Sequence, residues 1–210
     1  MSCFCNLNCE SQSGHLLLST SSIMWNQDLY TQAWHFAAEA HGRENQTYPG
    51  NNYPYIFHVG MVAMETMAAL AEESYTHPDL AVQCALLHDV IEDTAVTYEQ
   101  IKNEFGSAVA NGVLALTKNP AVGDKPAQMA DSLTRIQEQS HEIWIVKLAD
   151  RISNLQAPPH YWGKEKTIRY RDEAQLIYNA LSPASPFLAK RLASKIEGYQ
   201  EYISSSKYRS

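Results

Sequence analysis

The sequence lacks a long apolar segment, a cysteine framework and a surplus of positive charge. No run approaches the ~20 apolar residues of a membrane-spanning helix. The only apolar run near the N-terminus is "LLL" at 16–18, with no Lys or Arg before it. No secretory signal is therefore expected, and a cytoplasmic location is predicted. The net charge of −7 argues against nucleic acid or an anionic membrane as a partner, although a local basic patch can still hold a small anion.

The four cysteines do not form a disulfide pattern. Cys3, Cys5 and Cys9 crowd the first nine residues, and Cys84 stands alone in an apolar segment. A chain of 210 residues with 45% hydrophobic content can build one core without disulfide bonds. The CxCxxxC cluster could bind a metal, but no fourth ligand lies near it. We therefore expect residues 1–24 to be a disordered tail.

Strand patterns and internal repeats are also missing, and helical patterns follow one another instead. Predicted helices cover 27–42, 56–73, 78–92, 98–106, 107–117, 126–139, 141–155, 164–181 and 185–203. Asn26 is an expected N-cap, and Thr97 with Gln100 resembles a capping box. The predicted fold class is all-α, with one domain over residues 25–205.

Ionisable residues interrupt the apolar segment "ALLHDVIEDT", residues 85–94. Burying such groups costs several kcal/mol unless a partner compensates them. On one continuous helix, His88 lies above Glu92 and Asp89 above Asp93, because residues four apart share a face. Adjacent His88 and Asp89 then point about 100° apart, so both reach one ion only at the edge of the helix.

Two more polar candidates lie in other apolar helices. His58 follows a loop in "PYIFHVG", and Asp150 interrupts "IWIVKLADRISNL". One ion held by these two residues together with His88 and Asp89 would compensate the burial of all four. Two imidazoles with two carboxylates suit a divalent transition metal such as Mn, Fe or Zn.

Each of these residues also has a plainer interpretation. A lone helical histidine is usually a satisfied core or surface residue. Glu92 and Asp93 can simply be a solvated helix end, and Asp150 can pair with Lys147 or Arg151 in a structural salt bridge. The combination over three apolar helices favours the metal site.

Five segments together resemble the HD-domain phosphohydrolases, and among them the hydrolase domain of RelA/SpoT proteins and the small alarmone hydrolases. They are "AAEAHG" (37–42), "PYIFHVGMVA" (54–63), "ALLHDVIEDT" (85–94), "FGSAVANGVLALTK" (105–118) and "VKLADRISNL" (146–155). The resemblance spans roughly residues 27–182. It implies a single helical HD domain with one Mn²⁺ ion, rather than Fe²⁺ or Zn²⁺, bound by His58, His88, Asp89 and Asp150.

The resemblance also implies an activity of the stringent response. This is the removal of pyrophosphate from the 3′ position of the guanosine alarmones (p)ppGpp. Glu92 and Asp93 would orient the attacking water, Asn154 would lie near the ribose, and Tyr170 would help hold the nucleoside. The implied partner is a small anionic nucleotide.

The substrate needs cations beyond the metal. Lys147 and Arg151 flank Asp150, and "KEKTIRYR" at 164–171 supplies more, although a solvated helix face explains that run equally well. Alarmone hydrolases usually carry a basic pair after the "AAEAHG" helix, often as "GQxRK". Here only Arg43 is basic in that segment. Arg43 and Lys147 are the expected substrate contacts.

The base is less well defined than the reaction, because the segment after Arg43 diverges. Adenosine analogues, (p)ppApp, are the near alternative to (p)ppGpp. NADPH losing its 2′-phosphate is a more remote one. An alternative of another class is a sensor that binds such nucleotides without turnover. All four ligand positions and both carboxylates are present, which favours an enzyme.

Overall fold

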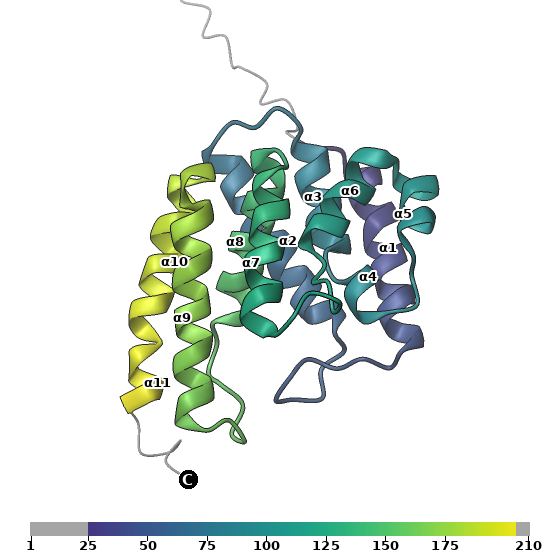
Figure 1. The fold of residues 1–210 in the computed structure, drawn as a ribbon. Helices are drawn as coiled ribbons and strands as arrows, with labels where there is room; N and C mark the ends of the chain where they lie inside the picture. The colour runs from purple at the N-terminus through teal and green to yellow at the C-terminus, as the bar shows by residue number, and fades with distance from the viewer. Residues whose placement is uncertain (1–24, 205–210) are drawn as a thin grey trace, which may run out of the picture.

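The structure, a computed structural model, describes residues 25–204 of the chain. Its elements are α1 (Gln27–Arg43), α2 (Ile56–Glu72), α3 (Pro78–Leu87), α4 (Val90–Asp93), α5 (Tyr98–Phe105), α6 (Ser107–Leu116), α7 (Lys125–Gln137), α8 (His141–Asn154), α9 (Lys164–Leu181), the 3₁₀ turn η1 (Ser182–Ala184), α10 (Pro186–Gly198) and α11 (Gln200–Ser204). Within this range the only β pairing is one isolated bridge, so the all-α prediction is confirmed (Figure 1). The predicted tail and its three cysteines lie outside the described residues.

Helix α8 is the centre of the fold. Helices α2, α3, α9 and α10 all pack against it (Figure 1). A helix enclosed in this way is buried on nearly every side, which requires apolar residues around its whole circumference. Ile143, Ile145, Val146 and Leu148 point in different directions around α8, and each has almost no exposed surface. Asp150 is buried among them, so it needs polar partners within the protein.

Local signals in the sequence place several helix starts correctly. The Asn26 side chain accepts hydrogen bonds from two backbone N–H groups in the first turn of α1. Thr97 and Gln100 form the expected capping box at α5. Such caps satisfy backbone donors that the helix leaves open, and each contributes about 1 kcal/mol.

The expected single helix over 78–92 is wrong. Helix α3 ends at Leu87, and α4 begins at Val90 after Asp89, whose φ and ψ are −104° and −3°. His88 therefore does not lie one helical turn above Glu92. Because the chain turns between His88 and Asp89, both side chains can face the same point instead of diverging by about 100°.

The core also depends on a close approach at Gly112 of α6. A Cβ atom placed there would lie 2.5 Å from Cδ1 of Ile143 and 2.8 Å from Sγ of Cys84. Cys84 is fully buried, and burial raises the pKa of its thiol. It is thus a small packing residue that stays protonated, as expected for a cysteine remote from ligands.

Candidate metal centre

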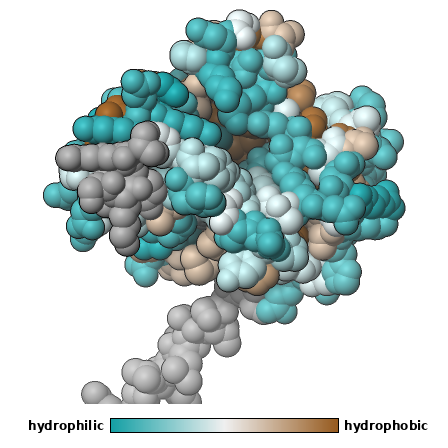
Figure 2. Space-filling model, turned by 90° about the horizontal axis from the view of Figure 1, so that it is seen from below, coloured by the Kyte–Doolittle hydropathy of each residue, from teal (hydrophilic) through white to brown (hydrophobic). Residues whose placement is uncertain are grey.

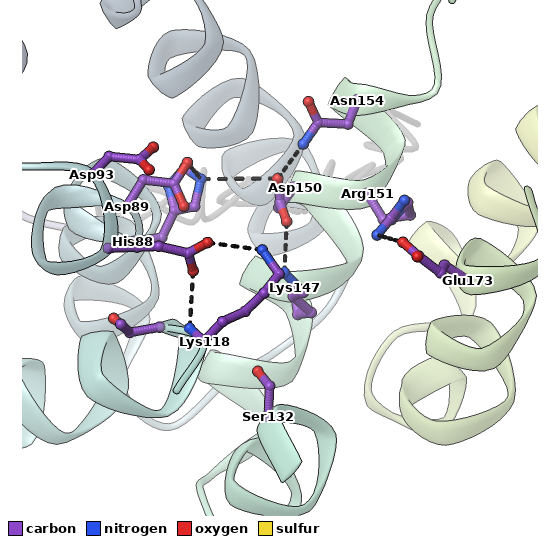
Figure 3. Close-up of polar contacts among 12 residues, drawn as sticks. His88, Asp89, Asp93, Lys118, Ser132, Lys147, Asp150, Arg151, Asn154 and Glu173 are labelled. Carbon is purple, nitrogen blue, oxygen red and sulfur yellow. Dashed lines mark hydrogen bonds and ion pairs between the residues drawn. The ribbon is translucent and has the colours of Figure 1, made fainter. Parts of the chain in front are cut away.

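Three separate parts of the chain bring the expected ligands together. His58 lies in the first turn of α2, His88 and Asp89 occupy the break between α3 and α4, and Asp150 projects from α8. Figure 3 shows His88 and Asp89 on one side of the site, with Asp150 facing them from α8. His58, His88 and Asp150 offer ligand atoms that all lie within 4.8 Å of one another.

Asp89 joins this group through its Oδ2 atom. That oxygen lies 2.9 Å from Nε2 of His88 and 3.6 Å from Nε2 of His58. Nε2 of His58 lies 3.3 Å from Nε2 of His88 and 3.4 Å from Oδ1 of Asp150. Two imidazole nitrogens and two carboxylate oxygens therefore point at one small volume, as a divalent transition ion requires.

The hydrogen bonds of His88 fit its role as a ligand. Its Nδ1 lies 2.9 Å from the carbonyl oxygen of Ala85, and a carbonyl can only accept. Nδ1 therefore carries a proton, and Nε2 is the ring nitrogen that faces the cluster. Burial by itself would lower the pKa of His88, but Asp89 and Asp150 raise it to about 9. The centre thus favours positive charge, which an ion would supply.

Asp150 is held from two further sides. Nζ of Lys147 donates to its Oδ2 at 2.9 Å, and the Asn154 side-chain amide donates to its Oδ1. Burial would raise the pKa of this carboxyl, but Lys147 and then His58 keep it well below its usual range. Lys147 and Asn154, expected as substrate contacts, therefore orient the carboxylate of a candidate metal ligand. Their substrate contacts stay a prediction.

Tyr55 orients the carboxylate of Asp89 in the same way, a role that was not predicted from the sequence. Its hydroxyl donates to Oδ2 of Asp89, and burial together with Asp89 raises the pKa of the phenol. Tyr48 also contacts the centre, because its ring is stacked on that of His58 with the two centroids 5.9 Å apart. Both tyrosines belong to the segment between α1 and α2, where a basic pair was expected rather than aromatic residues.

The two expected catalytic carboxylates have different surroundings. Glu92 accepts hydrogen bonds from both the backbone N–H and the Nζ of Lys118, at 2.9 and 2.8 Å. Asp93 accepts one hydrogen bond, from Nε2 of Gln46 at 2.9 Å. Burial and then the charge of Asp89 raise the pKa of Asp93. Asp93 thus has a raised pKa and accepts fewer hydrogen bonds than Glu92 does.

Gln46 links Asp93 to a buried histidine. A carboxylate only accepts, so the Gln46 amide turns its NH₂ group to Asp93 and its oxygen to His41. That oxygen lies 2.7 Å from Nδ1 of His41, which therefore carries the proton. Burial lowers the pKa of His41, which is consistent with a neutral ring. Neither residue was predicted as part of the site from the sequence, although His41 belongs to the "AAEAHG" segment.

The remaining two expected substrate residues lie in different settings. The guanidinium of Arg43 is largely exposed and pairs with Glu39 one turn earlier on α1. Tyr170 is held by Arg151, whose guanidinium lies 4.4 Å from the ring centroid. Burial raises the pKa of Tyr170 to about 12. Figure 3 shows Arg151 turned away from Asp150 towards Glu173.

A cavity of about 920 Å³ is lined by residues of α4, α7 and α9, among them Glu92. We call it the basic cavity. Its wall carries Glu92, Lys118, Lys125, Trp162, Lys166, Arg169, Tyr170 and Glu173, with Met129 among its apolar residues. Figure 2 shows a hollow with an apolar floor and a hydrophilic rim on the face where the loops before α2 and α9 lie. The volume of the basic cavity lies in the range of small-molecule binding sites.

Comparison with known proteins shows the family to which the chain belongs. A family model described as HD domain matches residues 33–186, and the chain therefore belongs to the HD-domain family. The chain is similar to the guanosine-3′,5′-bis(diphosphate) 3′-pyrophosphohydrolase MESH1 of Xenopus tropicalis, with 31% identity over 171 residues, covering 78% of this chain and 90% of the relative. The Danio rerio MESH1 protein is 28% identical over 162 residues, covering 75% and 86%.

A solved structure shares the fold. It belongs to a metazoan orthologue of SpoT described as hydrolysing ppGpp, and superposes with a TM-score of 0.70. The match has 22% sequence identity and covers 82% of this chain and 96% of the other. At that identity, it supports the fold alone. None of the helices between residues 25 and 204 has the length and apolar character to cross a membrane.

Proposed function

We propose that this protein hydrolyses the 3′-pyrophosphate of guanosine 3′,5′-bis(diphosphate) and its pentaphosphate analogue, with one Mn²⁺ ion as cofactor. The observation that carries the proposal is the convergence of His58, His88, Asp89 and Asp150 from three parts of the fold. The relatives named for this reaction cover most of the chain.

The ion would be held by these four residues. When bound, it polarises phosphoryl oxygens and lowers the pKa of water. Two imidazoles with two carboxylates match the preferences of Mn²⁺ and its neighbours in the transition series. The protein contributes fixed ligand directions, because Lys147, Asn154 and Tyr55 already hold the carboxylates.

Asp93 is the general base in this proposal. Water forms a bond to the phosphorus attached to the ribose 3′-oxygen, and the bond between that phosphorus and the 3′-oxygen breaks. Asp93 takes a proton from the water, and the 3′-oxygen gains one. The products are GDP or GTP and pyrophosphate. Gln46 occupies Oδ2 of Asp93, so Oδ1 is the atom that accepts the proton.

Turnover assays test the proposal against its alternatives. The purified protein with Mn²⁺ is incubated separately with ppGpp, ppApp and NADPH, and products are identified by chromatography. We expect GDP and pyrophosphate from ppGpp, with loss of activity in EDTA and recovery on adding Mn²⁺ back. Binding of ppGpp without turnover would instead support the sensor. Release of single phosphate from NADPH alone would overturn the 3′-pyrophosphate reading.

A further inference from the structure

The basic cavity carries a charge opposite to that of the protein as a whole. Its wall holds four cations, from Lys118, Lys125, Lys166 and Arg169, and two carboxylates, from Glu92 and Glu173. The complete chain has a net charge of −7. A local surplus of cations in an acidic protein concentrates anionic ligands at that point of the surface.

Three of these cations are not neutralised by the protein. Among residues 25–204, no carboxylate lies within salt-bridge distance of Lys125, Lys166 or Arg169, although Lys118 pairs with Glu92. Nζ of Lys166 instead lies 4.2 Å from the ring centroid of Trp162. Cations that converge on one cavity without acidic partners repel one another, and an anion there would relieve that repulsion.

The cavity adjoins the metal centre through Glu92 of α4, which lines the cavity, lies three positions after Asp89 and pairs with Lys118. Burial would lower the pKa of this ammonium group, but Glu92 raises it, and the more distant charges of Asp150 and Asp89 add to that effect. Tyr170, on the cavity wall, likewise feels the charge of Asp150. A nucleotide whose reacting phosphate lies at the metal centre can therefore extend into the basic cavity.

The segment between α1 and α2, which also borders the centre, offers no such charge. The segment 44–55, which supplies Tyr48 and Tyr55, contains no lysine or arginine. Arg43 before it is exposed and paired with Glu39. The cavity wall also has an aromatic surface, because the rings of Trp162 and Tyr170 meet edge to face at 5.0 Å. Such a surface can stack on a base, and it does so without selecting one purine.

We propose that the basic cavity binds the nucleotide's second phosphate group, the 5′-diphosphate, through Lys125, Lys166 and Arg169, with the base against Trp162. This inference rests on the proposed function for the orientation of the substrate. Residues of α7 and α9 would then recognise the 5′-diphosphate, because the segment after α1 has no cations that could do so. It also predicts that removing the 5′-diphosphate from a ligand removes the contribution of these cations.

Binding of GDP tests the inference without turnover. GDP keeps the base and the 5′-diphosphate and has no 3′-pyrophosphate. Isothermal titration of the full chain with GDP and with guanosine compares ligands that differ only in the diphosphate. We expect the Lys166→Gln/Arg169→Gln variant to bind GDP about tenfold or more weakly than the unmodified protein. We also expect salt to weaken GDP binding less in the variant.

A matched variant controls for the loss of two charges. Lys164→Gln/Lys190→Gln removes the same charge from exposed positions that do not line the cavity. It should bind GDP within about twofold of the unmodified protein. If both double variants weaken GDP binding equally, or neither does, the cavity is not the 5′-diphosphate site.

Turnover separates this inference from the proposed function. The preference for ppGpp over guanosine 3′-diphosphate, measured as a ratio of kcat/KM, should fall about tenfold or more in Lys166→Gln/Arg169→Gln. A protein that hydrolyses neither nucleotide refutes the proposed function, while GDP titration still decides the cavity. A protein that hydrolyses ppGpp with an unchanged ratio in the variant refutes the cavity assignment alone.

Discussion

The metal centre and the basic cavity hold their charges in opposite ways. At the centre, every charged ligand has a partner fixed by packing. Asp150 contacts Lys147 and Asn154, and Asp89 contacts Tyr55. In the cavity, Lys125, Lys166 and Arg169 are exposed on the surface. Buried charges must be compensated by partners within the fold, whereas exposed charges are solvated by water and stay available to bind a ligand.

This difference predicts that the metal centre determines the rate of the reaction and that the basic cavity determines the affinity for the ligand. A centre whose ligands are fixed in advance loses little free energy to reorganisation when the reaction occurs. Long exposed side chains adapt to the ligand that arrives, and their contribution depends on ionic strength. Substitutions at the centre should therefore abolish turnover, and those in the cavity should change affinity.

The largest effect is expected from His88→Ala. Removing one of two imidazoles opens the ion site, and we expect kcat/KM for ppGpp to fall by more than about 10⁴-fold. Metal content measured by mass spectrometry should fall with it. His35→Ala, at an exposed position on α1, is the control. Full metal stoichiometry in His88→Ala would show that the ligand set is wrong.

Asp93→Asn should come next, with a loss of about 10²–10⁴-fold in kcat. A base works only when deprotonated, and burial raises the pKa of Asp93. Activity of the unmodified protein should therefore fall as the pH drops through that raised pKa. The acidic limb should vanish from the pH profile of Asp93→Asn. Glu92→Gln, where Lys118 already occupies the carboxylate, should lose less. The reverse order would assign the base to Glu92.

Lys147→Met compares a buried cation with an exposed one directly. It leaves the buried Asp150 carboxylate without its ammonium partner, so the free energy of unfolding in EDTA should fall by about 3 kcal/mol. Lys125→Met, in the cavity wall, should change it by less than about 0.5 kcal/mol. Urea titration followed by circular dichroism measures both. Equal losses would contradict the contrast between the two regions.

Gln46→Leu should give the smallest effect, a displaced pH profile. The hydrogen bond from Gln46 lowers the pKa of Asp93, so its loss raises that pKa. The acidic limb of kcat/KM should therefore move to higher pH, by up to about one unit. Gln32→Leu, at an exposed amide bonded to Glu104, is the control. An unmoved limb would show that Gln46 does not act on the base.

Helix boundaries and ligand candidates could be predicted because their signals are local. Asn26 and Thr97 mark helix starts through hydrogen bonds to residues two or three positions away. His58, His88 and Asp150 stand out because ionisable groups in apolar helices require compensation. The structure brings these three within a few ångströms of one another, and ion binding itself stays a prediction.

The helix break and the hydrogen-bond partners of Glu92 and Asp93 could not be predicted in the same way. No proline or glycine marks the end of α3 at Leu87, so helical periodicity continued through His88. Gln46 reaches Asp93 across 47 positions, and Lys118 reaches Glu92 across 26. Contacts over such separations depend on how helices pack, and helical periodicity carries no information about them.

The sequence by itself determined a helical chain with imidazoles and carboxylates in segments too apolar to leave them unpaired. Periodicity, capping and the cost of burying charge are sufficient for that conclusion. Only the tertiary structure decided that Asp93 is freer than Glu92, that Tyr55 holds Asp89, and that cations without acidic partners gather between α7 and α9. Each of these depends on which distant side chains come within hydrogen-bonding distance, and this is set by packing around α8.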